Sequence, residues 1–159
     1  MVSYDNLILN IKNFIAVNIN VAPELIYMFN QNSAVLPKNK EYIIIQLTGK
    51  EIVSLPVREN ETLSQLSALN FQIDCYGQSI AYEWSTRLYM LLNSIEANED
   101  LRKIGLSVIT CNAPINLTGI DFSDQYLERW SVNTSIEITD EITISTKYID
   151  GIDIRIIGV

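Results

Sequence analysis

A strict two-residue alternation in residues 127–139 is the sequence feature that most constrains the fold. Residues 66–76 show the same period, with apolar side chains at alternate positions from Phe71 to Cys75. In the later segment the alternate set is Trp130, Val132, Thr134, Ile136 and Ile138. Because successive side chains of a β-strand point to opposite faces of a sheet, both segments are expected to form strands with one buried and one polar face.

Three further segments have the composition of strands. They are the short apolar run 25–29, the β-branched run 42–47 and residues 105–111. The second of them is expected to continue, bent around Gly49, as far as residue 56. Polar residues 59–64 predict a turn or hairpin end before the strand at 66–76.

Two segments repeat apolar residues at helical spacing, residues 4–17 and residues 78–95. In the longer one a single apolar stripe is formed by Ala81, Trp84, Leu88, Leu91 and Ile95. Spacings of three and four residues place such side chains on one face of a helix. Residues 96–102 are expected to add a short second helical turn.

The order of these elements predicts the α+β class. A chain of 159 residues suits one domain, and we expect a mostly antiparallel twisted sheet with helices packed on one face. Residues 1–139 are expected to form this domain. Residues 140–159 are expected to form a strand or hairpin extension, turning at Asp150-Gly151, that contacts another subunit or a partner.

The composition excludes several kinds of enzyme. The chain has no histidine, so it lacks the usual general base and the usual metal ligand. No glycine-rich phosphate loop is present, and Cys75 and Cys111 are expected to be reduced structural residues. Asp150 and Asp153 supply too few ligands to bind calcium. We therefore expect no catalytic residue, no metal and no cofactor.

Charge and hydropathy bear on partners and location. Eleven basic against nineteen acidic residues give a net charge of −8, which argues against a dedicated DNA-gripping surface. No apolar run approaches the roughly 18 residues of a membrane span. The first residues lack the basic region of a signal peptide. We expect synthesis in the cytoplasm and no contact with a membrane.

Three motifs resemble those of the bacteriophage neck and tail terminator family. The stretch 29–42 resembles its N-Q-N…P…Y segment before the first main strand, and Phe71–Gly77 is similar to its Q-(V/I)-D-x-Y-G strand leading into a helix. Gln125–Ser131 is similar to its Y-x-x-R-W strand opening. The motifs follow the family order with compatible gaps, and together they span about residues 30–139.

The resemblance implies a non-enzymatic structural protein of the virion, made in the cytoplasm of the bacterial host. Members are similar in fold to tail terminators, small α+β units that form a ring, usually a hexamer. Such a ring caps the tail tube, ends tail polymerisation and contacts head-completion or connector proteins, and in a contractile tail it can meet the sheath. DNA only passes through the central channel, where we expect some of the acidic side chains to lie.

Three groups of residues are candidate contacts. For Arg129 and Trp130, at the start of a strand, core packing is expected first, and the alternatives are that the pair stacks, locks the fold or contacts another subunit. The other candidates are the amides of a predicted loop and one face of the C-terminal segment: Asn30, Gln31, Asn32, Ile152, Ile154 and Ile156. Two rival functions stay open, another head–tail connector or completion protein and a small acidic binding adaptor.

Overall fold

The strands of the protein form one large sheet and one small one. The computed structural model describes residues 4–28, 41–120 and 126–144. Its strands are β1 (Ile26–Met28), β2 (Tyr42–Ile52), β3 (Val57–Glu59), β4 (Thr62–Tyr76), β5 (Ser107–Cys111), β6 (Ile115–Asn116), β7 (Gly119–Ile120), β8 (Tyr126–Leu127) and β9 (Arg129–Thr143). The order in the seven-stranded sheet is β1-β2-β4-β9-β5, with β3 paired to β4 and β6 to β9, while β7 and β8 pair separately.

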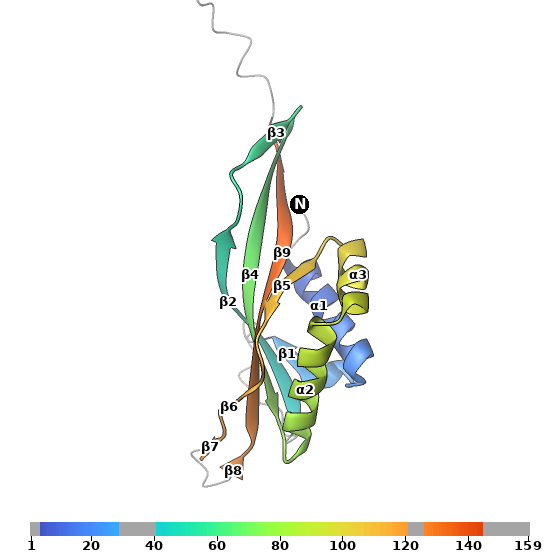
Figure 1. Ribbon diagram of the computed structural model, residues 1–159, viewed down its shortest axis with the longest axis vertical. Coiled ribbons are helices and arrows are strands. Elements are labelled where there is room, and N and C mark those ends of the chain that lie inside the picture. Colours follow the sequence, from blue (N-terminus) through green and yellow to red (C-terminus); the bar gives the residue numbers. More distant parts are fainter. Residues whose placement is uncertain (1–3, 29–40, 121–125, 145–159) are drawn as a thin grey trace, which may run out of the picture.

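Helices cover one face of the large sheet (Figure 1). They are α1 (Tyr4–Ile19), α2 (Ile80–Leu92) and α3 (Ile95–Lys103), and a short 3-10 helix, η1 (Pro23–Leu25), precedes β1. All the described pairings of the large sheet are antiparallel except that of β1 with β2. The expected α+β class, with a mostly antiparallel sheet and helices on one face, is confirmed.

The two alternating segments become the central pair of strands, β4 and β9. Each has 15 residues, and their ladder runs without a shift from Thr62 opposite Thr143 to Tyr76 opposite Arg129. On the other side of β4, β2 follows with a bulge between Leu47 and Gly49. This bulge is the expected bend near Gly49, because an extra residue in one strand increases its local twist.

The core lies between the helices and the sheet. One face of each central strand contributes to it, and α1 and α2 complete it with buried aliphatic side chains. Its best-buried members include Ile15, Ile43, Ile45, Phe71, Ile73, Cys75, Leu88 and Val132. The alternation that predicted the strands therefore also identified which of their faces is buried.

The helix expected at 78–95 is shorter than expected, and the short helical turn expected at 96–102 is the separate helix α3. The first helix, α2, ends at Leu92, and Ser94 then caps α3 by accepting a hydrogen bond from the Ala97 N–H at 3.1 Å. Asn93 between them bonds back to the Tyr89 carbonyl through its side chain at 2.8 Å. Asparagine and serine favour such local bonds over helix continuation, so the helical stripe runs across a break.

Other boundaries differ by a few residues. The turn expected at 59–64 is confined to Asn60, which has a φ of 55°, and Glu61, so β4 begins earlier than predicted. The last strand starts after Glu128, and β9 continues to Thr143 across the expected domain limit at residue 139. The division into 1–139 and 140–159 stays a prediction, since the described part of the chain ends at residue 144.

Candidate functional site

An ion pair joins the two motif strands on the sheet face opposite the helices. Arg129 of β9 donates a hydrogen bond through Nη2 to Asp74 Oδ2 of β4 at 2.7 Å. The Asp74 residue is only 4% exposed, and the Gln72 amide donates to both of its oxygens at 3.1 and 3.2 Å. Because a buried carboxylate needs such partners, this acid holds strands β4 and β9 in one register.

Tyrosine rings extend the cluster to a third strand. Tyr42 of β2 lies opposite Tyr76 of β4, and their rings stack with centroids 4.6 Å apart. The Arg129 guanidinium lies 5.6 Å from the centre of the Tyr76 ring. Tyr42, Gln72, Asp74, Tyr76 and Arg129, from here the polar-aromatic cluster, thus unite one described residue or more from each of the three motifs.

The protonation states of the cluster residues favour a structural role over a catalytic one. Burial raises the pKa of Tyr76 to about 12, against the lowering effect of Arg129. Partial burial would lower the pKa of Arg129, but the hydrogen bond and charge of Asp74 raise it above its usual value. At neutral pH the tyrosine is therefore neutral and the arginine charged. The cluster therefore stabilises the pairing of β2, β4 and β9.

Trp130 lies on the other face of β9 from Arg129, so the two side chains do not stack on each other. Its ring meets that of Tyr82 of α2 edge-on at 4.9 Å, and its Nε1 donates to Glu128 Oε1 at 2.8 Å. The second oxygen of Glu128 accepts the Ser79 N–H at 2.7 Å, before α2 begins. The stacking expectation is wrong because neighbouring residues of a strand point to opposite faces. Core packing is the role that this geometry supports for Trp130.

The sequence did not single out Asp74 and Glu128. Both lie inside the quoted motifs, Asp74 next to Cys75 and Glu128 directly before Arg129. The alternation of β4 could have identified Asp74, because it places this acid on the polar face of the strand and Arg129 carries the opposite charge. The sequence does not give the register that places Asp74 opposite Ser131 and within reach of Arg129.

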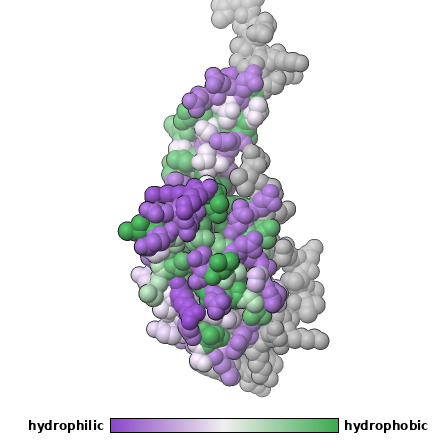
Figure 2. Space-filling model, turned by 90° about the vertical axis from the view of Figure 1, so that its right-hand side faces the viewer, coloured by the Kyte–Doolittle hydropathy of each residue, from purple (hydrophilic) through white to green (hydrophobic). Residues whose placement is uncertain are grey.

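A second candidate surface is the part of the sheet that extends beyond the helices (Figure 1). We call it the arm, formed by the C-terminal halves of β2 and β9, the N-terminal half of β4, β3, and residues 53–56 between β2 and β3. Figure 2 shows apolar side chains interspersed with polar ones on its helix-side face. Its exposed apolar side chains are Ile52, Val53, Leu55, Val57, Leu66 and Ile142. Surfaces of this kind commonly contact other protein.

The base of the arm carries an ion pair. Lys50 Nζ and the Ser67 hydroxyl both lie 2.6 Å from Asp140 Oδ2. Slight burial raises the pKa of Asp140, but the hydrogen bonds from Lys50 and Ser67 outweigh it and lower that pKa below its usual value. Asp140 therefore stays charged at neutral pH and links β2, β4 and β9.

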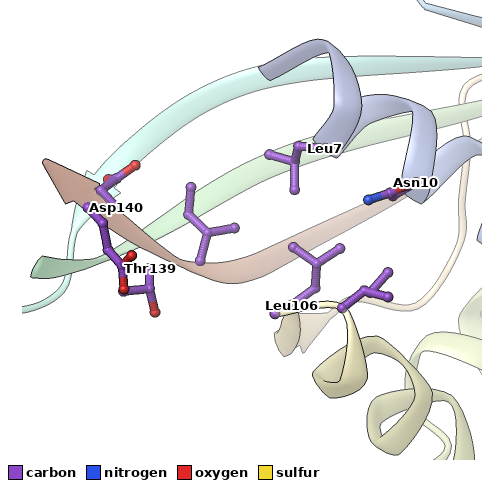
Figure 3. Close-up of a pocket in the computed structure, with 9 residues that line it drawn as sticks. Leu7, Asn10, Leu106, Thr139 and Asp140 are labelled. Atoms are coloured by element: carbon purple, nitrogen blue, oxygen red, sulfur yellow. The ribbon is translucent and has the colours of Figure 1, made fainter. Parts of the chain in front are cut away.

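A pocket of about 230 Å³ lies where the arm leaves the helix layer. Leu7 and Asn10 of α1 line one side of it, and Leu106 and the end of β9, including Thr139 and Asp140, line the other (Figure 3). The mixture of aliphatic and polar side chains suits a peptide segment better than a small charged ligand.

The remaining predicted contacts fall elsewhere. Asn30, Gln31, Asn32, Ile152, Ile154 and Ile156 lie outside the residues that the structure describes. Their contact role stays a prediction.

The cysteines, the possible metal ligands and the helices of the described residues can also be compared with what reactive thiols, metal sites and membrane spans require. Burial raises the pKa of Cys75 well above its usual range and that of Cys111 to about 11. Both thiols are free and are protonated at neutral pH, which makes them weak nucleophiles. Over residues 4–28, 41–120 and 126–144, no three acidic or cysteine side chains gather as metal ligands. In that same part of the chain, no helix has the length and apolar character to cross a membrane.

Comparison with known proteins identifies the family. A family model described as Phage neck terminator protein matches residues 5–159. No curated protein matches the chain. The matched residues include all three motifs, whose described parts the sheet brings together in the polar-aromatic cluster. The chain therefore belongs to the phage neck terminator proteins, a family of structural components of the bacteriophage neck.

Proposed function

We propose that this protein forms a closed ring at the neck of a tailed phage, where it caps the tail tube and ends tail polymerisation. The ring is a homohexamer that contacts tube protein on one side and a head-completion or connector protein on the other. In a contractile tail it also meets the top of the sheath. The family match over residues 5–159 is the observation that carries this proposal.

The surface of the described domain supports ring formation. A closed ring needs two different patches on each subunit that fit each other head to tail. The arm offers one exposed apolar patch, with Ile52 72% and Leu55 84% exposed. The pocket at its base, lined partly by Leu7 and Leu106, is a separate concave patch. Two different patches on one subunit, one of them hollowed, are compatible with a head-to-tail contact.

The charge of the chain agrees with DNA that passes without being held. A net charge of −8 repels the phosphate backbone, whereas binding proteins neutralise phosphates with clustered Lys and Arg. We propose that part of this acidic excess faces the channel of the ring. A cryo-EM map of the ring with a neutral or basic lumen would contradict this part of the proposal.

Tail length is the decisive measurement for the function. The gene for this protein is deleted from its phage, and tails are imaged by negative-stain electron microscopy with and without the protein supplied in trans. We expect overlong or uneven tails without heads in the deletion, and uniform tails on complementation. Free tails of normal length in the deletion would exclude a terminator and would favour a connector or completion protein.

The oligomeric state separates the ring from a small adaptor. Size-exclusion chromatography with light scattering is expected to give a particle close to six times 18.1 kDa, for the free protein or on addition of tail tubes. A monomer or dimer that does not assemble on addition of tail tubes would favour the adaptor.

A further inference from the structure

The outer edge of β9 is only half covered. Strand β5 pairs with it from Cys111 opposite Thr134 to Ser107 opposite Glu137. Beyond Glu137, β9 continues to Thr143, and on this side no strand among the described residues pairs with it. The arm therefore presents an open strand edge, from here the β9 edge, of residues 138–143.

Backbone groups of the β9 edge point outward at alternate residues. The Asn133 carbonyl accepts a bond from Asn112 N at 2.9 Å on the outer side, while Ile144 N donates to Glu61 O at 2.7 Å on the β4 side. Since the β4–β9 ladder has no register shift, odd-numbered residues of β9 face outward. The N–H and C=O groups of Thr139, Glu141 and Thr143 are therefore oriented to receive another strand.

The pocket lies directly beside this edge. Ile138 lines it together with Leu7 and Leu106, and Ile142, 48% exposed, continues the same face of β9 toward the arm tip. A second hollow of about 310 Å³, lined by Ser107 and Glu137 among others, lies where β5 begins. A strand added in line with β5 would pair with the β9 edge and place alternate side chains over these apolar residues.

The C-terminal segment of the chain has the pattern that such a strand needs. Ile152, Ile154 and Ile156 occupy alternate positions, and Arg155 shares the other face with Asp153. On the β9 edge Ile138, Asp140 and Ile142 face the helix side, while Glu141 faces the other side. An added strand with its isoleucines over the pocket thus brings Arg155 to the face that carries Glu141.

We expect the segment to reach this edge from a second copy. The two-residue turn expected at Asp150-Gly151 would pair residues 152–156 with residues 149–145 of the same chain. A strand 152–156 paired in this way would still have one free edge for a neighbour.

We propose that residues 152–156 of one copy add as a strand to the β9 edge of the next copy, with their isoleucines over the pocket of Leu7, Leu106 and Ile138. This contact deepens the proposed ring and rests on it, because repetition around the ring supplies each subunit with one donor and one acceptor.

Cross-linking between two marked chains tests the contact. One chain carries Glu141→Cys and the other Arg155→Cys, both with Cys111→Ser, and the two are co-produced with different affinity tags. A short bis-maleimide is expected to join the two chains at least tenfold more than when Glu24→Cys, on the exposed η1, replaces Glu141→Cys. A third preparation carries both Glu141→Cys and Arg155→Cys on one chain. A cross-link that forms only within that chain, or no cross-link in protein that is oligomeric, would overturn the proposal.

A backbone substitution provides a second test. Thr139→Pro removes an outward N–H that β4 does not use, and proline is tolerated at such positions of edge strands. We expect Thr139→Pro, but not Thr139→Ala, to abolish the cross-link and shift the oligomer to monomers while circular dichroism stays unchanged. If the proline variant does not fold, Ile154→Asp against Ile154→Val makes the same test from the donor side.

The outcomes distinguish this inference from the proposed function. Intact rings and uniform tails with Thr139→Pro or Ile154→Asp would overturn the strand contact and leave the terminator function standing. Normal tails in the gene deletion would remove the terminator function, whereas the cross-link between copies would still report the contact.

Discussion

The ion pair between Asp74 and Arg129 offers the most direct test of how the motif residues act. Replacing Arg129 with Met removes the guanidinium but keeps a long side chain over Tyr76. The Asp74 carboxylate, 4% exposed as a residue, then retains only the Gln72 amide among its described partners. If the pair locks β4 to β9, the folded state must lose stability.

The expected loss of stability depends on how deeply Asp74 and Arg129 are each buried. Removing one partner of a fully buried pair costs about 3–5 kcal/mol. The Arg129 side chain is 33% exposed, so water screens part of its interaction, and we expect about 2–3 kcal/mol. For a chain of this size that corresponds to a drop in Tm of about 4–12 °C.

Thermal and urea unfolding of four proteins complete the experiment: wild type, Arg129→Met, Asp74→Asn and the double variant. We expect the double variant to lose less than the sum of the single losses, because a neutral amide no longer needs the arginine. A coupling energy below about 0.5 kcal/mol would refute the reasoning. Lys103→Met is the matched control, since its pair with Asp100 is exposed, and no measurable change in Tm is expected.

Three further predictions concern the ends of β4 and α3. Gly77 has a φ of 149°, and an added Cβ would collide with Ile80 Cγ2, so Gly77→Ala should lower the free energy of unfolding in urea by about 1–3 kcal/mol. No change in that free energy would show that the turn relaxes freely. The pKa of Tyr76 in the folded protein is about 12, above the ordinary value near 10. The difference in tyrosinate absorbance between wild type and Tyr76→Phe should therefore appear near pH 12 in the folded protein and near pH 10 in urea. The same raised pKa means that Tyr76 contributes stability below pH 10 that is lost as the pH rises toward 12; an equally steep alkaline loss in Tyr76→Phe would contradict this. Ser94→Ala removes the cap of α3 and should lower the free energy of unfolding by about 1 kcal/mol, with Ser94→Asp as the variant that restores it.

The sequence was most informative where side-chain periodicity is strong. The alternation around Trp130 and Phe71 predicted the two central strands and their buried faces, because period two has one structural solution at this length. The bend near Gly49 was predicted from a glycine inside a strand pattern, and the bulge lies there. These features depend on local patterns, which a single sequence contains.

What the sequence did not reveal depends on contacts between distant residues. The pairing of Asp74 with Arg129 spans 55 positions and needs the register of β4 against β9. The suggested stacking of Arg129 on Trp130 conflicted with the alternation itself, which already placed these neighbours on opposite faces of the strand. The break between the two helices was expected after residue 95 but lies after Leu92, because the local bonds of Asn93 and Ser94 outweigh an apolar stripe that continues past them.

The position of β9 in the chain has a consequence for biosynthesis. It is the last strand that the structure describes, yet it pairs with β4 at the centre of the sheet, across 53 residues at Tyr76–Arg129 and 81 at Thr62–Thr143. Pairings so distant in sequence close slowly, since the loop entropy is lost before the contacts form. The central ladder cannot form until β9 has left the ribosome. Chains terminated before β9 therefore lack the central pairing of the sheet and are not available for assembly.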